Sequence, residues 1–254
     1  QQTGQLQQAE VIYNQILQED PEHADALHLL GVMARQRGEY DSAVELITKA
    51  IAKDPSVSIF HNNLGNALKD LGRLDEAMEC YQKALRLEPD FSVAHSNLLL
   101  SLHYHNSIGP ARLFSQHQQW AAQHAAPLAP TIQPHLNDRS LNRCLRIGYF
   151  SPDFYAHSVA YFIESVLRSH DRPAFEIFCY SDVARPDQVT NHLKGLVANW
   201  RDVVGMSDEQ IADLIRMDQI DILVDLAGHT SRNGMLLFAR KPAPVQVTYL
   251  GYPN

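Results

Sequence analysis

A 34-residue periodicity over the first hundred residues constrains the fold of this chain more than any other feature. Shifting the sequence by 34 positions aligns glycines with glycines, alanines with alanines and prolines with prolines. The aligned sets are Gly4, Gly38 and Gly72; Ala9, Ala43 and Ala77; and Pro21, Pro55 and Pro89. Such a period is typical of a solenoid, in which each repeat buries its apolar face against its neighbours. We therefore expect stacked helix pairs here.

The repeat has the features of the tetratricopeptide (TPR) pattern, a helical hairpin of 34 residues. Small residues such as Ala43 and Ala50 allow the two helices to approach closely. Gly38 is placed at the turn between them, and Pro55 ends the second helix because it lacks a backbone donor. Residues 1–20 supply only the second helix of a repeat. We therefore expect earlier repeats to precede this sequence.

Two asparagines occupy the same repeat position on the helices that line the concave groove of a TPR superhelix. They are Asn63 and Asn97, and the equivalent residue one repeat earlier is Leu29. Side-chain amides can pair with the backbone of an extended peptide whatever its sequence. The two asparagines therefore predict either a short peptide-binding ladder or ordinary polar residues on a helix surface.

A connecting region follows the repeats. Residues 91–104 keep a helical spacing and close the array, and Pro110 begins a further helix that extends to about Ala125. Residues 126–142 carry three prolines and no apolar periodicity, which is typical of an inter-domain connector. The predicted organisation is TPR repeats over 1–104, a helical bridge and prolyl linker over 105–141, and a second domain over 142–254.

From Leu145 onward, short apolar runs alternate with amphipathic segments, which indicates βα units and a parallel sheet. The expected strands are 145–150, 175–180, a weaker run near 200–204, 221–226 and 244–250; the expected helices lie near 158–169, 187–198, 208–217 and 232–240. Five strands with four crossovers predict a Rossmann-like layer. Its ligand crevice is expected beyond the carboxyl ends of the strands.

The loop SPDFYAHS follows the first expected strand and carries two titratable side chains, Asp153 and His157. Ser158 is placed to cap the helix that comes next. We expect Asp153 to be structural, either pairing with loop amides or capping a helix, rather than to act on a ligand.

A second loop, AGHTSRN, follows the fourth expected strand in an equivalent position. It places His229, Thr230 and Arg232 at the carboxyl end of the sheet. Asp225 ends the preceding strand and is either a cleft carboxylate or a buried, hydrogen-bonded one; we favour the latter.

Several functional classes are disfavoured by what the sequence lacks. No G-x-G-x-x-G follows the first strand and no P-loop or G-x-S-x-G occurs, which argues against NAD enzymes, P-loop kinases and serine hydrolases. The net charge of -8 argues against a nucleic-acid partner. No apolar run approaches the roughly 18 residues that a membrane helix needs. We expect a soluble, cytoplasmic protein.

Metal and disulfide sites are not expected either. Cys80, Cys144 and Cys179 are odd in number and widely spaced, unlike a disulfide framework or a zinc site. The histidine pairs 103/105 and 117/124 have no carboxylate or cysteine at ligand spacing.

The whole chain resembles the protein O-linked N-acetylglucosamine transferases of glycosyltransferase family 41. The resemblance is carried by TPR repeats, a helical bridge, and the segments RIGYFSPDFYAHSVAYFIE, DILVDLAGHT and RKPAPVQVTYLGYPN. It implies a GT-B fold whose first lobe is residues 142–254. It also implies inverting, metal- and cofactor-independent transfer of a sugar from a nucleotide to serine or threonine hydroxyls, with the TPR groove presenting the protein acceptor.

The family resemblance leaves the donor open between two nucleotide sugars. Most of the motif resembles enzymes that use UDP-GlcNAc, whereas HSVAYFIE and GHT also resemble the Spindly-type plant members, which use GDP-fucose. In this family the nucleotide sits mainly on a second lobe that follows GYPN, so residues 1–254 alone are expected to be inactive. A third possibility is a non-catalytic TPR adaptor.

The resemblance also assigns roles to residues in the two loops. His157 matches the first-lobe histidine proposed as general base, which either accepts the hydroxyl proton or only orients the loop and binds substrate. His229 and Thr230 match a loop at the cleft where they would contact sugar or acceptor. The family position of His229 is often a tyrosine.

Overall fold

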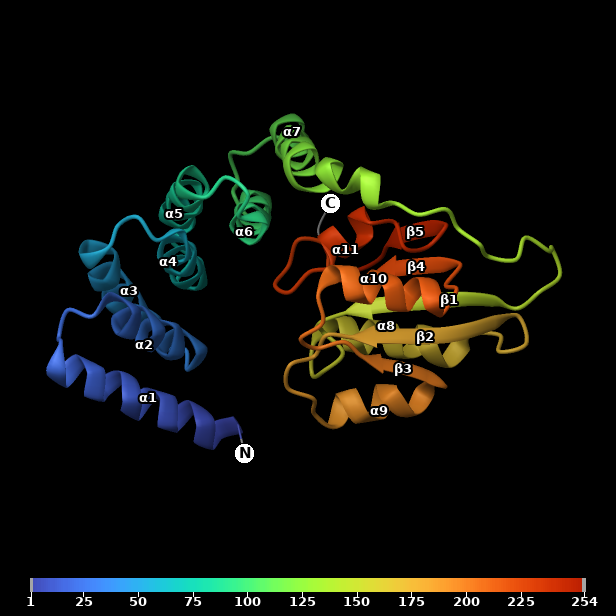
Figure 1. Cartoon of the computed structure of the whole chain (residues 1–254), viewed down its shortest axis with the longest axis horizontal. Helices are drawn as coiled ribbons and strands as arrows, with labels where there is room; N and C mark the ends of the chain where they lie inside the picture. Colours follow the sequence, from blue (N-terminus) through green and yellow to red (C-terminus); the bar gives the residue numbers. More distant parts are fainter. Residues whose placement is uncertain (1, 253–254) are drawn as a thin grey trace. The chain divides into compact units, whose positions relative to one another are not determined.

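The computed structural model describes residues 2–252, and Figure 1 labels its helices and strands. Pro253 and Asn254 of the GYPN motif lie outside the described residues. The chain divides into two compact units, residues 1–118 and 119–254. The division falls within the stretch 105–141 that was expected to connect two domains.

In the part of the first unit that the structure describes, the regular elements are all helices, which follow one another as hairpins (Figure 1). They are α1 (Gln2–Glu19), α2 (Ala24–Gln36), α3 (Tyr40–Lys53), α4 (Ser58–Asp70), α5 (Leu74–Leu87), α6 (Ser92–His103) and α7 (Pro110–Trp120), the last of which extends two residues past the boundary. The predicted hairpins are α2–α3 and α4–α5, preceded by the single second helix α1. The TPR prediction is therefore confirmed.

Contacts across each hairpin explain the repeated glycines. A β-carbon at Gly31 would lie 2.6 Å from Ile47, and one at Gly65 would lie 2.6 Å from the ring of Tyr81. Ile47 and Tyr81 are themselves completely buried and occupy equivalent positions 34 residues apart. Gly38 turns the chain between α2 and α3 with a φ of 81°, which an L side chain rarely adopts.

The bridge helix changes its geometry along its length. The helix that begins at Pro110 is α-helical to Trp120, continues as a π-helical turn to Ala125 and then tightens into a 3₁₀ stretch over Ala126–Thr131. The first six residues of the expected connector are therefore helical. Pro127 fits there because the first turn of a helix leaves backbone N–H groups unpaired.

The second unit is a five-stranded parallel sheet in the order β3-β2-β1-β4-β5. Its strands are β1 (Leu145–Ser151), β2 (Phe175–Ser181), β3 (Asn199–Asp202), β4 (Ile222–Asp225) and β5 (Val245–Thr248); its helices are α8 (Ser158–Ser169), α9 (Gln188–Leu196), α10 (Asp208–Met217) and α11 (Met235–Ala239). All five predicted strands and all four crossover helices are present.

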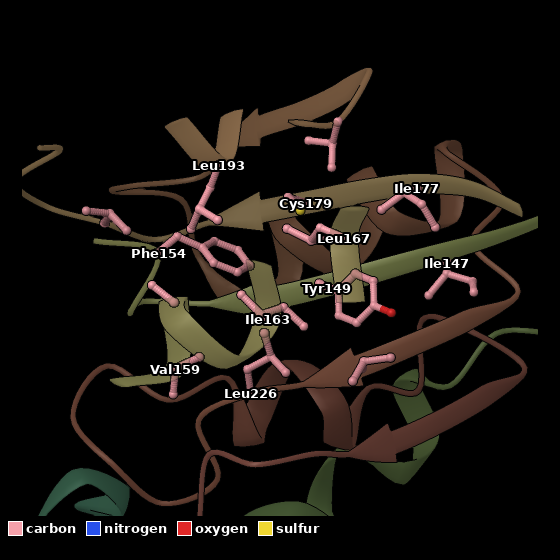
Figure 2. Close-up of a cluster of buried hydrophobic side chains, with 14 residues drawn as sticks. Ile147, Tyr149, Phe154, Val159, Ile163, Leu167, Ile177, Cys179, Leu193 and Leu226 are labelled. Carbon is pink, nitrogen blue, oxygen red and sulfur yellow. The ribbon is translucent and has the colours of Figure 1, made fainter. Parts of the chain in front are cut away.

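Two hydrophobic clusters cover the two faces of the sheet. On one face, Tyr149 and Ile177 pack toward Ile163 and other residues of α8 and α9 (Figure 2). On the other face, Phe150 and its neighbours pack against α10 and α11. Adjacent residues of β1 thus enter opposite clusters, as expected for a strand buried on both faces. Burying each large side chain stabilises the fold by about 1.5–3 kcal/mol.

Candidate active site at the switch point of the sheet

The strand order creates one place where the direction of winding reverses. The chain proceeds outward from β1 through β2 to β3, then returns to β4 on the other side of β1 and continues to β5. The loops that leave β1 and β4 therefore diverge at the carboxyl edge. In open parallel sheets this is where ligands bind. The two loops that bracket it are SPDFYAHS and AGHTSRN.

The loop after β1 is fixed at several points. The amide of Asp153 donates to the hydroxyl of Ser151 at 2.9 Å, and the ring of Phe154 is completely buried in the first hydrophobic cluster. The amide of Ala156 donates to the carboxylate of Asp187 at 2.8 Å. Asp187 also caps α9 through a capping box, so the loop is tied to the start of the neighbouring helix.

His157 is the N-cap of α8. Its Nδ1 accepts a hydrogen bond from the amide of Val159 at 3.3 Å, and its backbone has extended dihedrals. The expectation that Ser158 caps this helix is wrong, since Ser158 is the first helical residue. The imidazole is half-buried and lies against the ring of Tyr155, with centroids 5.6 Å apart.

Asp153 does not have the structural role that its position suggested. It caps no helix, because His157 does so, and within the described residues its carboxylate accepts no hydrogen bond from a loop amide. The side chain is half-buried. Burial raises the pKa of this carboxyl group, and the nearby His157 partly lowers it.

The loop after β4 begins on a buried carboxylate. Asp225 accepts hydrogen bonds from the amides of Ala227 and Gly228, at 3.0 and 2.9 Å, and from the Thr248 hydroxyl at 3.3 Å. Gly228 adopts a φ of 55° in this turn. Burial raises the pKa of Asp225, whereas the three donors lower it. The favoured interpretation of Asp225 as a buried, hydrogen-bonded group is confirmed.

His229 lies in a cluster of aromatic rings and is only 6% exposed. Its ring meets Trp120 edge-on at 4.7 Å and Tyr252 at 5.4 Å. A β-carbon at Gly228 would lie 2.3 Å from Tyr252, so only glycine permits this packing. Sequence reasoning missed Trp120, because it comes from the end of the bridge helix about a hundred residues earlier.

The remaining polar residues of the second loop are held by local bonds. Thr230 donates its hydroxyl to the carbonyl of Ala227 at 2.9 Å and leaves its oxygen able to accept. Arg232, with a φ of 58°, donates to both oxygens of Asp182 at 3.1 and 2.7 Å. Asp182 follows β2 and was not foreseen, because nothing in the sequence pairs two residues 50 positions apart.

The two TPR asparagines belong to an internal hydrogen-bond ladder across α2, α4 and α6. Asn97 donates to the Asn62 side chain at 2.9 Å, Asn62 donates to Asn63 at 3.2 Å, and Asn63 pairs with Nε2 of His28 at 2.8 Å. Sequence reasoning missed Asn62 and His28, which precede the predicted positions by one residue in their repeats. A role of Asn63 and Asn97 in peptide binding stays a prediction.

Among the described residues, no three His, Cys, Asp or Glu side chains converge as a metal site would require. By spacing in the sequence, the candidate metal-binding pairs are His103 with His105 and His117 with His124. In the structure His103 contacts His117, and their Nε2 atoms lie 3.1 Å apart. The separation fits a hydrogen bond between neutral imidazoles. The described part of the chain also has no helix long and apolar enough to cross a membrane.

Comparison with known proteins relates this arrangement to a family. The profile of glycosyl transferase family 41 matches residues 94–254, and tetratricopeptide repeat profiles match residues 2–55 and 58–91. The chain belongs to glycosyltransferase family 41. The family-41 segment of this chain begins within α6 and contains both switch-point loops.

Curated relatives of this family-41 chain include plant proteins. The tomato protein (Solanum lycopersicum) named probable UDP-N-acetylglucosamine–peptide N-acetylglucosaminyltransferase SPINDLY is 39% identical over 160 residues, which cover 61% of this chain and 17% of the relative. The Arabidopsis thaliana relative of the same enzyme name, designated SEC, is 38% identical over 111 residues, covering 43% of this chain and 11% of its own. The chain thus spans less than a fifth of these relatives.

A solved structure matches nearly the whole family-41 chain. A mutant of the O-GlcNAc transferase of Thermobaculum terrenum superposes with a TM-score of 0.90 at 40% identity. The match covers 96% of this chain and 47% of that one. The expected combination of a TPR superhelix with a GT-B-type α/β lobe is therefore confirmed.

Proposed function

We propose that the protein carrying this chain is a protein O-glycosyltransferase that transfers N-acetylglucosamine from UDP-GlcNAc to serine and threonine hydroxyls. The observation that carries the proposal is that two polar loops leave adjacent strands, β1 and β4, at the switch point of a family-41 lobe. The relatives named above support the sugar, since their names specify UDP-N-acetylglucosamine as donor and a peptide as acceptor.

In this proposal the two units divide the work between them. The TPR helices present the protein acceptor, with Asn63 and Asn97 among the candidate contacts. The loop residues His157, His229 and Thr230 form the first-lobe side of the reaction site. Transfer inverts the anomeric centre and needs neither metal nor cofactor, because the polar side chains supply proton transfer and binding. The protein works in the cytoplasm.

A second candidate is protein O-fucosyl transfer from GDP-fucose. It is favoured by the segments HSVAYFIE and GHT, which resemble the Spindly-type members. The two donors differ in both base and sugar. Donor choice therefore separates the candidates without any change to the chain.

The full-length protein, incubated with UDP-GlcNAc, GDP-fucose and a serine- and threonine-containing peptide library, tests the proposal. Mass spectrometry of the peptides identifies the sugar by the mass added. Addition of N-acetylhexosamine supports the first candidate, and addition of deoxyhexose supports the second. Modification with neither donor would contradict both and leave the TPR adaptor as the better account.

A further inference from the structure

We propose that Asp153, rather than His157, accepts the proton of the acceptor hydroxyl, while His157 donates a hydrogen bond to the substrate. This assignment rests on the proposed transferase function and deepens it. It follows from which side-chain atoms of Asp153 and His157 already form hydrogen bonds within the loop after β1.

The N-cap role of His157 determines where its ring proton lies. A neutral imidazole has one donor and one acceptor nitrogen. Nδ1 accepts from the amide of Val159 at 3.3 Å, so the proton resides on Nε2. Nε2 is then a donor and has no lone pair with which to take a proton.

Moving that proton would break the cap. If Nε2 were to accept a proton from substrate, the neutral ring would first have to carry its hydrogen on Nδ1, directly opposite the N–H of Val159. Two donors would then face each other, and the start of α8 would lose its side-chain acceptor. The local fold of the loop therefore favours His157 as a donor.

Asp153 has the opposite properties. An ionised carboxylate only accepts, and within residues 2–252 neither of its oxygens is occupied by a hydrogen bond. The loop backbone around it is held by the Ser151 hydroxyl and by the bond from the amide of Ala156 to Asp187. His157 lies four positions further along the same loop.

The charged and titratable neighbours of Asp153 are few. His157 favours the ionised form of Asp153. The pKa of the Tyr155 hydroxyl is raised by burial first and then by the charges of Asp153 and Asp187. Burial raises the pKa of Asp153 itself. A carboxylate that is partly desolvated in this way is a better proton acceptor than one in water.

The proposed step is balanced without a further reactant. The oxygen of the serine or threonine hydroxyl forms a bond to the anomeric carbon of the sugar nucleotide. The bond from that carbon to the phosphate oxygen breaks, and its electron pair leaves with the nucleoside diphosphate. The hydroxyl proton passes to the carboxylate of Asp153, while Nε2–H of His157 donates to the bound sugar nucleotide or acceptor.

Two conservative variants of the full-length protein separate the roles. Asp153→Asn keeps the shape of the side chain but removes the proton acceptor, and we expect kcat to fall roughly 100-fold or more. His157→Gln keeps an N–H donor but cannot act as a base, and we expect it to retain turnover within about 10-fold. Asp171→Asn, an exposed aspartate in the loop before β2, is the matched control and should be unchanged.

Binding and stability measurements exclude a structural explanation. Calorimetric titration with UDP-GlcNAc and GDP-fucose should show that Asp153→Asn binds the donor as the wild type does. Because burial raises the pKa of Asp153, its ionisation destabilises the folded state at neutral pH, so Asp153→Asn should unfold at the same or a higher temperature. A structural carboxylate would give a clearly lower unfolding temperature.

The pH profile of the wild type gives a readout that needs no variant. Turnover should decline on the acid side as the carboxylate becomes protonated, and the pKa of that limb should change little with temperature, unlike that of an imidazole. Near-normal turnover by Asp153→Asn, or an imidazole-like limb together with complete loss in His157→Gln, would overturn the assignment. Absence of transfer by the wild type with either donor would instead contradict the proposed function.

Discussion

At the level of single residues, the two histidines singled out in the sequence lie in different surroundings. His157 is half-buried at the start of α8 and keeps one ring nitrogen uncommitted to the cap, whereas His229 is packed between Trp120 and Tyr252. An imidazole must reach substrate to act on it. We therefore expect His157 to be better placed for contact with substrate than His229.

Another residue that matters for stability is Asp221, which precedes β4. Its carboxylate accepts hydrogen bonds from both Nη atoms of Arg143 at 2.6 Å. It also accepts one from the backbone amide of Arg146 at 2.9 Å and one from the side-chain amide of Asn137 at 2.7 Å. Burial alone would raise the pKa of Asp221, but these donors lower it. The extended segment before β1 is thereby pinned to the amino edge of the sheet.

Replacing Asp221 by Asn should lower the free energy of unfolding, because the guanidinium of Arg143 loses its charged partner. The pKa of Asp221 is lowered in the folded state, so its stabilisation is present at neutral pH and lost as the pH falls through that lowered pKa. Urea unfolding between pH 7 and pH 3 should show a smaller acid dependence in Asp221→Asn. Asp213→Asn, whose carboxylate is largely exposed, should stay within about 0.5 kcal/mol of wild type.

At the level of elements, the approach of α4 and α5 depends on the missing side chain of Gly65. We expect Gly65→Ala to cost about 1–3 kcal/mol, because the new methyl group would lie 2.6 Å from the ring of Tyr81. Thermal unfolding measures this. Gly195→Ala, in α9 with nothing within 4 Å of the added carbon, should be neutral or slightly stabilising. Equal effects in both variants would show that the repeat glycines are not packing positions.

The extent to which elements follow from the sequence depends on how local their causes are. The strand β1 and helix α10 match their predicted bounds closely, because apolar runs and the Ser207 capping box are local signals. Helix α11 begins at Met235 rather than near residue 232, because Arg232 adopts a left-handed conformation that no helix contains. That conformation accompanies the ion pair with Asp182, a partner distant in sequence.

The candidate site was predictable in the same uneven way. The positions of His157 and Thr230 follow from strand ends and switch-point geometry, which can be inferred from alternating patterns. That His157 rather than Ser158 caps α8 was not predictable, because both side chains can cap a helix and the backbone dihedrals decide which one does. The enclosure of His229 by Trp120 depends on where the bridge helix ends, which no local pattern specifies.

At the level of the whole molecule, two kinds of architecture are joined in one chain. A helical repeat buries residues between neighbours only, whereas the parallel sheet buries β1 in the centre of five strands. The 34-residue repeat predicted the helical unit, and the alternation of apolar runs with amphipathic segments predicted the sheet. Assignment to glycosyltransferase family 41 required motif resemblance, because a Rossmann-like sheet supports many unrelated reactions.

The central claim is that the switch-point loop after β1 carries sugar transfer to protein hydroxyls. The most direct measurement is the rate of peptide glycosylation by the full-length protein, followed by mass spectrometry, for wild type and His157→Ala. We expect wild type to modify serine or threonine and His157→Ala to turn over at least about 10-fold more slowly, while His192→Ala, an exposed histidine of α9, remains normal. Unchanged turnover in His157→Ala, or no modification by the wild type, would contradict the account.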